Sequence, residues 1–192
     1  AVLEAAQEAM VVAVALTALV AFVAVIVLGV LDGLLLAMLV SFVMLLKNMA
    51  RAQVSTLGRL AGSHDYVDMR RHPEAQAVPG VLIVRPEQAL FFGNADTVLG
   101  AIWTLVQQSR TSGLRAVVLS LEASPDLDST SVEALSELAA ELSGIGVQLQ
   151  LARVKDHARA LLDRVHITGL APENYASWSV DDAVQRLQLP NT

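Results

Sequence analysis

The sequence predicts an α/β domain with a mostly parallel sheet, preceded by an all-α transmembrane helical hairpin. Three observations lead to this prediction. Residues 9–46 are almost continuously apolar and contain one charge, Asp32. From Lys47 onward the chain is polar, and short apolar runs alternate with segments whose apolar residues recur at helical spacing. About 110 residues of this alternating pattern are enough for one hydrophobic core.

The apolar stretch is too long for one membrane span and long enough for two short ones, because a spanning helix needs about 20 residues. Residues 28–33 hold two glycines and Asp32, an acid that is costly at mid-bilayer depth, so they are predicted to form the turn. We therefore expect a hairpin over residues 1–46, with spans at about 9–30 and 32–46. One bent helix with Asp32 buried against a partner is the alternative.

A group of bases, Lys47, Arg51 and Arg59, follows the second span at once. By the positive-inside rule this side of the membrane is the cytoplasm. We expect residues 47–65 to be a basic cytoplasmic linker. Both ends of the hairpin would then lie on the same side, which predicts a multi-pass protein of the plasma or inner membrane with its soluble domain in the cytoplasm.

The soluble domain is expected over residues 66–189, after a short strand at 66–69. Residues 116–119 are apolar throughout, as a central parallel strand is. Gly144 and Gly146 predict a helix end, and Ser179 predicts a helix start. The expected order is ββαβαβαβα, with strands at 81–84, 89–92, 116–119, 147–151 and 175–178 and helices at 95–108, 130–143, 156–165 and 180–187.

Composition excludes several classes of function. The formal net charge is −6; residues 1–46 sum to −3 and residues 47–72 to +3, which leaves −6 for residues 73–192, so the soluble part is acidic and a poor partner for nucleic acid. The chain has no cysteine, which excludes disulfides, thiolate metal sites and cysteine nucleophiles. It begins with Ala rather than Met, and we expect it to be N-terminally incomplete.

The candidate site is the run Asp128, Ser129, Thr130 and Ser131, which stands at a helix N-terminus beyond a parallel strand. Open α/β sheets present their sites at this edge. Thr130 with Glu133 has the spacing of a capping box, and Asp128 or Ser129 can also cap. A cap accounts for one hydroxyl but not for three beside an acid. The functional interpretation is phosphorylation of Ser129 or Thr130, which adds about two negative charges.

Enzymatic and metal-binding functions are not supported by the pattern. Serine catalysis needs a histidine with an orienting partner, and His157 and His166 stand at the two ends of one predicted helix without one. The histidines and aspartates at positions 64, 65, 68 and 72 match no known ligand spacing. We therefore expect no catalytic residues, no metal and no cofactor.

Several pieces of the sequence, taken together and in order, resemble one known family. They are LGVLDG at 28–33, YVDMRRHP at 66–73, PGVLIV at 79–84, LFFGNA at 90–95, AVVL at 116–119, DLDST at 126–130 and LARVKD at 151–156. This ordered set is similar to the C-terminal end of the SulP (SLC26-like) anion and sulfate transporters, which consists of the last two membrane helices and a STAS domain.

The resemblance implies a C-terminal membrane-anchoring and regulatory portion of a sulfate transporter that does not transport alone. Expected partners are the lipid bilayer, the rest of the transporter membrane domain, a second copy in a homodimer and a regulatory protein at the loop. STAS domains of anti-sigma-factor antagonists are phosphorylated at the second hydroxyl of an Asp-Ser-Ser-Gly motif. That position is Thr130 here, and Ser131 replaces the glycine. The alternatives are a free-standing membrane-tethered STAS module that acts as a phosphorylation-dependent switch, and a plain assembly domain.

Overall fold

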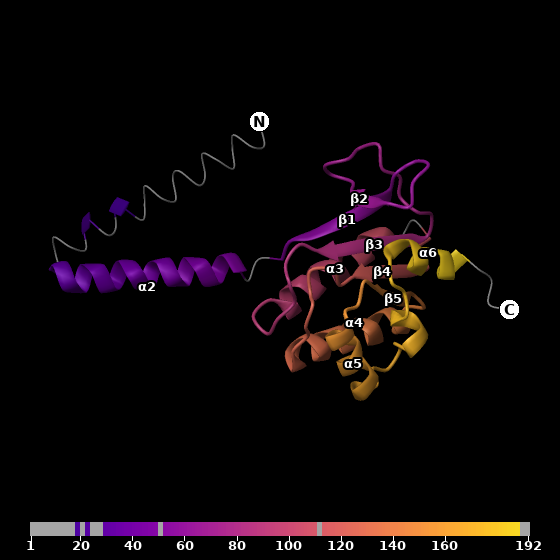
Figure 1. Cartoon of the computed structure of the whole chain (residues 1–192). Helices are drawn as coiled ribbons and strands as arrows, with labels where there is room; N and C mark the ends of the chain where they lie inside the picture. The colour runs from indigo at the N-terminus through magenta and orange to yellow at the C-terminus, as the bar shows by residue number, and fades with distance from the viewer. Residues whose placement is uncertain (1–17, 20–21, 24–28, 50–51, 111–112, 189–192) are drawn as a thin grey trace. The chain divides into compact units, whose positions relative to one another are not determined.

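The computed structural model describes the chain except residues 1–17, 20–21, 24–28, 50–51, 111–112 and 189–192. The chain divides into two compact units, Ala1–Ala50 and Arg51–Thr192 (Figure 1). The first contains α2 (Val30–Met49). The second contains β1 (Val54–Arg59), β2 (Tyr66–Asp68), β3 (Val81–Pro86), α3 (Ala95–Ser109), β4 (Ala116–Ser120), α4 (Ser129–Gly144), β5 (Gln148–Ala152), α5 (Asp156–Val165), the 3₁₀ turn η2 (Pro172–Tyr175) and α6 (Val180–Gln188).

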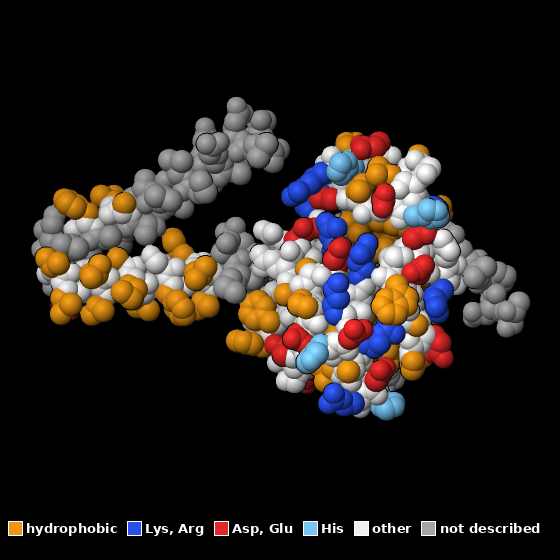
Figure 2. All heavy atoms as spheres, viewed as in Figure 1, with side chains coloured by type: hydrophobic (Ala, Val, Ile, Leu, Met, Phe, Trp, Pro, Cys, Tyr) orange, Lys and Arg blue, Asp and Glu red, His pale blue; other side chains and the backbone are white. Residues whose placement is uncertain are grey.

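Helix α2 has the length and composition of a membrane span. Gly29, at φ +90°, precedes it, and Asp32 lies in its first turn, where the helix dipole favours an acid. The window Val30–Lys47 has a mean hydropathy of 2.2 with 6% of it buried. Figure 2 shows apolar side chains along the surface of α2. Among the described residues, α2 is the one helix that is long and apolar enough to cross a membrane. The predicted second span, 32–46, falls within it, whereas most of the predicted first span lies outside the described residues.

The second unit is built on a five-stranded sheet in the order β2-β1-β3-β4-β5. β1 pairs antiparallel with both β2 and β3, whereas β3, β4 and β5 are parallel. Each parallel step crosses over through a helix, α3 and then α4, as parallel pairing requires. The sheet is therefore a parallel α/β core extended by an antiparallel hairpin, and the predicted α/β class is confirmed.

The period-2 alternation of the strands divides the core between the two faces of the sheet. Leu82 and Val84 of β3 join the larger cluster with α3, α4 and α5, whereas Val81 and Ile83 join the smaller cluster with α6. On β4, Val118 faces the α6 side. All five β4 side chains are buried, which confirms the prediction of a central parallel strand.

Three sequence predictions are corrected by the structure. Residues 54–59, predicted as linker, form β1, which the pattern concealed because it buries a serine, Ser55, and includes Gly58. Residues 89–92, predicted as a strand, form a loop, because the Leu90 N–H donates to the Ser124 side chain instead of to a strand. Residues 175–178 begin in η2 and contribute to the sheet through one bridge, at Ser177.

The four helices predicted for the soluble domain are present, each within one residue of its expected ends. Ser179 caps α6 as predicted, because its Oγ accepts the Asp182 N–H at 3.0 Å while the Asp182 carboxylate accepts the Ser179 N–H at 3.1 Å. This reciprocal pair is a capping box. The observed order is βββαβαβα followed by η2 and α6.

Candidate functional site

The loop with the three hydroxyls lies where β4 ends and α4 begins, at the carboxyl edge of the parallel strands. Asp128 is the N-cap of α4, and its Oδ1 accepts the Ser131 N–H at 2.8 Å. Its Oδ2 accepts the Phe92 N–H at 2.7 Å. One carboxylate therefore starts a helix and also fixes a neighbouring loop, so Asp128 rather than Thr130 supplies the cap.

The charge of Asp128 is stabilised by these contacts. Burial opposes ionisation of the carboxyl, but the hydrogen bonds from Ser131 and Phe92 outweigh it and lower the pKa of Asp128. The carboxylate is therefore ionised at neutral pH, and as an ion it can only accept hydrogen bonds.

Burial separates the three hydroxyl residues. Ser129 is exposed and Thr130 is half-buried. Ser131 is 0% exposed. A modifying enzyme needs access to the hydroxyl, so Ser129 and Thr130 meet that requirement in this conformation and Ser131 does not.

The loop beside this site carries Phe91 and Phe92, whose rings meet edge to face at 5.5 Å. Asn94 holds the turn, because its Oδ1 accepts the Phe91 N–H at 2.9 Å and its Nδ2 donates to the Ala89 carbonyl at 3.0 Å. A Cβ on Gly93 would stand 2.6 Å from the Phe91 ring, so a side chain there would displace that ring.

Charged residues surround the carboxyl edge of the sheet. His157 lies 3.1 Å from Asp126. Glu122 lies 4.0 Å from Arg85 and 3.7 Å from Arg153. Arg153 has φ +56°, an uncommon conformation for a residue with a side chain. These ion pairs are exposed, so each contributes little to stability.

The three bases predicted to flank the membrane have different positions. Lys47 is in the last turn of α2, and Arg51 lies outside the described residues. Arg59 is part of β1 and not of the predicted linker. Its Nε donates to the Ser63 carbonyl at 2.8 Å, and its Nη2 lies 3.9 Å from Asp181.

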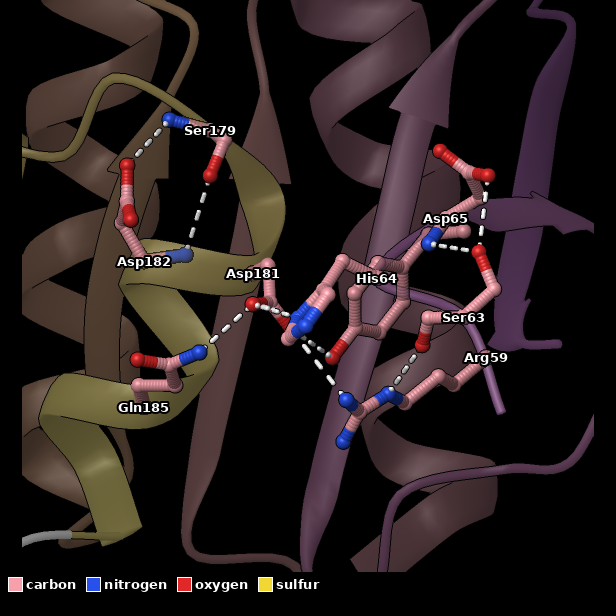
Figure 3. Close-up of polar contacts among 9 residues, drawn as sticks. Arg59, Ser63, His64, Asp65, Ser179, Asp181, Asp182 and Gln185 are labelled. Carbon is pink, nitrogen blue, oxygen red and sulfur yellow. Dashed lines mark hydrogen bonds and ion pairs between the residues drawn. The ribbon is translucent and has the colours of Figure 1, made fainter. Parts of the chain in front are cut away.

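Asp181 of α6 forms the centre of a polar cluster that sequence reasoning missed (Figure 3). Its side chain is 11% exposed. Oδ2 accepts from His64 Nδ1 at 2.7 Å and from Gln185 Nε2 at 2.6 Å, and Oδ1 accepts from the Tyr66 hydroxyl at 3.3 Å. We call Asp181 and its partners Arg59, His64, Tyr66 and Gln185 the Asp181 cluster. It joins the β1–β2 hairpin to α6.

The pKa values of Asp181 and Tyr66 in the Asp181 cluster are shifted in opposite directions. Burial opposes the charge of Asp181, but the hydrogen bond and positive charge of His64 outweigh it and lower the Asp181 pKa. Burial, followed by the negative charge of Asp181, raises the pKa of Tyr66 to about 12. No signal in the sequence could have revealed this cluster, because its members are up to 117 residues apart and match no motif.

A cleft of about 510 Å³ lies between α5 and η2. Its main polar groups are already paired. The Tyr175 hydroxyl donates to Asp163 at 2.8 Å, and Asn174 donates to the Leu149 carbonyl at 3.1 Å while accepting the Ala171 N–H at 2.9 Å. These bonds hold η2 against β5 and α5. Among the described residues, no group of three or more His, Asp or Glu side chains is arranged to hold a metal.

Residues 72–183 match the STAS domain family. High affinity sulfate transporter 2 of Stylosanthes hamata is 29% identical over 79% of this chain and 24% of its own length. A protein of Mycobacterium tuberculosis described as a probable sulfate transporter is 32% identical over 82% of this chain and 28% of its own length. The chain thus spans about a quarter of the length of these curated relatives.

Two solved structures share the fold. Murine solute carrier 26 family member A9, an anion transporter in the inward-facing state, has a TM-score of 0.76 and 20% identity over 90% of this chain and 28% of its own. A sulfate transporter family protein from Wolinella succinogenes has a TM-score of 0.51 and 23% identity over 64% of this chain and 96% of its own. Together with the family match, the sheet order and the sulfate transporter relatives, these likenesses lead to one conclusion: the chain belongs to the STAS domain family, in the form found in SulP (solute carrier 26) transporters.

Proposed function

We propose that this chain is the C-terminal membrane-anchoring and regulatory portion of a SulP-type sulfate transporter, and that it does not transport sulfate alone. The observation that carries the proposal is the succession of a span-length apolar helix, α2, and a STAS domain in one chain. The curated relatives named above are sulfate transporters about four times as long as the matched region. The relevant partners are the lipid bilayer, the rest of the membrane domain, a second copy in a homodimer and a regulatory protein.

The proposed orientation is multi-pass, with the STAS domain in the cytoplasm. The position of Lys47 in the last turn of α2 supports it, because bases accumulate on the cytoplasmic side of spans. A two-helix hairpin supplies no second repeat and no broken helix directed at a substrate, so it has no transport pathway of its own.

Regulation is assigned to the loop Asp128–Ser131. The exposure of Ser129 and the partial exposure of Thr130 at a helix N-terminus support phosphorylation there, because backbone N–H groups and the helix dipole favour a phosphate. The same feature favours the second candidate, a free-standing membrane-tethered STAS switch. The two candidates differ in the mass of the native polypeptide. A transporter polypeptide would have about four times the mass of the matched region.

Two assays test the proposal. The chain reconstituted in liposomes is expected to show no saturable sulfate uptake, and saturable uptake would refute the assignment. In the intact transporter, Thr130→Glu and Ser129→Glu are expected to change the transport rate or partner binding. If both variants behave like wild type while the protein remains folded, the loop is only a helix cap.

A further inference from the structure

Phe92 is exposed on a loop whose backbone is hydrogen-bonded. The residue is 73% exposed. Asp128 accepts the Phe92 N–H at 2.7 Å, and Ser124 accepts the Leu90 N–H at 3.0 Å. Because the backbone is already hydrogen-bonded, binding through this residue costs little backbone ordering, and aromatic residues often dominate the binding energy of protein interfaces.

The helices beside Phe92 are acidic. The loop leads directly into α3, and Asp128 ties it to the first turn of α4, so Phe92 stands where the N-termini of these two helices meet. Neither helix contains Lys, Arg or His. Their four acids are all exposed: Asp96, Glu133, Glu137 and Glu141. The exposed Asp126 also lies beside the loop, but it is paired with His157 at 3.1 Å.

We propose that Phe92 and these acids form a docking surface for a basic, amphipathic protein segment, and that a phosphate on Ser129 strengthens the docking. The inference rests on the proposed regulatory function and names the chemistry of its partner. The Phe92 ring supplies the apolar anchor, and the acids attract Lys and Arg side chains around it. A phosphate on Ser129 adds about two negative charges to the same surface.

The charge also decides against two other occupants. An anionic bilayer surface attracts basic segments and repels acids such as those of α3 and α4. In a dimer formed through this face, the acidic side chains of the two copies would face each other. Like-charge contacts across an interface are unfavourable.

The test uses residues 51–192 alone. This unit closes its own core, and the Wolinella succinogenes chain consists almost entirely of the matching fold. The probe is a labelled amphipathic helical peptide of Leu and Lys, about 18 residues or five turns long. Its control is the same peptide with Glu in place of Lys. Fluorescence anisotropy at low salt measures the dissociation constants.

We expect the Leu/Lys peptide to bind and the Leu/Glu peptide not to bind. Phe92→Ala should weaken binding at least about tenfold, as truncation of an interface anchor does. Phe92→Leu should retain part of the affinity. Trp178→Ala is the matched control, because Trp178 is 75% exposed but lies with its ring 5.7 Å from the Arg159 guanidinium, so it should bind like wild type. Ser129→Glu should tighten binding about threefold, the effect of one exposed charge.

The inference is overturned if Phe92→Ala and Trp178→Ala weaken peptide binding equally, or if the Leu/Glu peptide binds as well as the Leu/Lys peptide. It is also overturned if Phe92 is instead required for binding to vesicles of phosphatidylcholine and phosphatidylglycerol, or for dimerisation measured by light scattering. Each variant is checked by thermal unfolding. If binding is independent of Phe92 while Thr130→Glu still changes transport, the docking surface is wrong and the proposed function stands.

Discussion

Replacing Asp181 by Asn should destabilise the STAS domain far more than the same replacement of its neighbour Asp182. Both acids lie in the first turn of α6, so both lose the same favourable interaction with the helix dipole. Asp182 is exposed and takes part only in the capping box, which Asn can largely replace. Asp181 is buried and accepts hydrogen bonds from His64, Gln185 and Tyr66.

The magnitude follows from those bonds. The contacts at 2.6 and 2.7 Å are charge-assisted, and each loses about 1 kcal/mol when the acceptor becomes neutral. The amide NH₂ of Asn must also replace one of the two oxygens, so one set of donors loses its acceptor at a further cost of about 1 kcal/mol. We expect Asp181→Asn to lower the free energy of unfolding by about 2–3 kcal/mol and Asp182→Asn by less than about 1 kcal/mol.

Urea denaturation of residues 51–192, followed by circular dichroism, measures both values. The pKa of Asp181 is lowered from 3.8 in the folded state, so the ionised carboxylate stabilises the fold above pH 3.8 and this contribution is lost as the pH falls through the folded pKa. The difference between wild type and Asp181→Asn should therefore shrink below pH 3.8. Equal losses for the two variants at pH 7 would refute the role of the Asp181 cluster.

Three further results are expected. Asp181→Asn should lower the pKa of one of the two tyrosines from about 12 in a spectroscopic tyrosinate titration, and an unchanged titration would contradict the contact with Tyr66. Gly58→Ala should destabilise by about 2 kcal/mol, because its Cβ would stand 2.8 Å from Met69 Cγ and 3.1 Å from the Gln76 carbonyl oxygen; wild-type stability would show that Met69 moves freely. A cysteine at the exposed Ala61 should react with a membrane-impermeant thiol reagent only after cells are opened, and labelling of intact cells would place the domain outside.

The parallel core of the fold could be predicted from the sequence because its signals are local. β4 is a continuous apolar run, and the α4 and α6 boundaries carry glycine or a capping serine. β1 could not be predicted in the same way. It buries Ser55, whose Oγ donates to Asp68 at 3.2 Å, so a position that appears polar in the sequence is an interior position in the fold.

The candidate site was predicted in outline only. The row Asp128–Ser131 pointed to a helix start at a sheet edge, and the structure has one there. Which hydroxyl is buried depends on the direction in which each side chain leaves the first turn, so Ser129 and Ser131 could not be told apart in the sequence. The proximity of Phe92 to Asp128 spans 36 residues and depends on sheet order, which no local pattern specifies.

The Asp181 cluster also has a consequence for the order in which the domain folds. His64 and Asp181 are separated by 117 residues, and Tyr66 and Asp181 by 115. Contacts over such separations form late, because a long loop must close before they contribute. During synthesis the β1–β2 hairpin leaves the ribosome well before α6. Tyr66 and Arg59 therefore cannot contact Asp181 until α6 has been translated. Nascent chains arrested before α6 should therefore have a protease-sensitive hairpin. Docking of the last helix would then complete the packing of the first two strands.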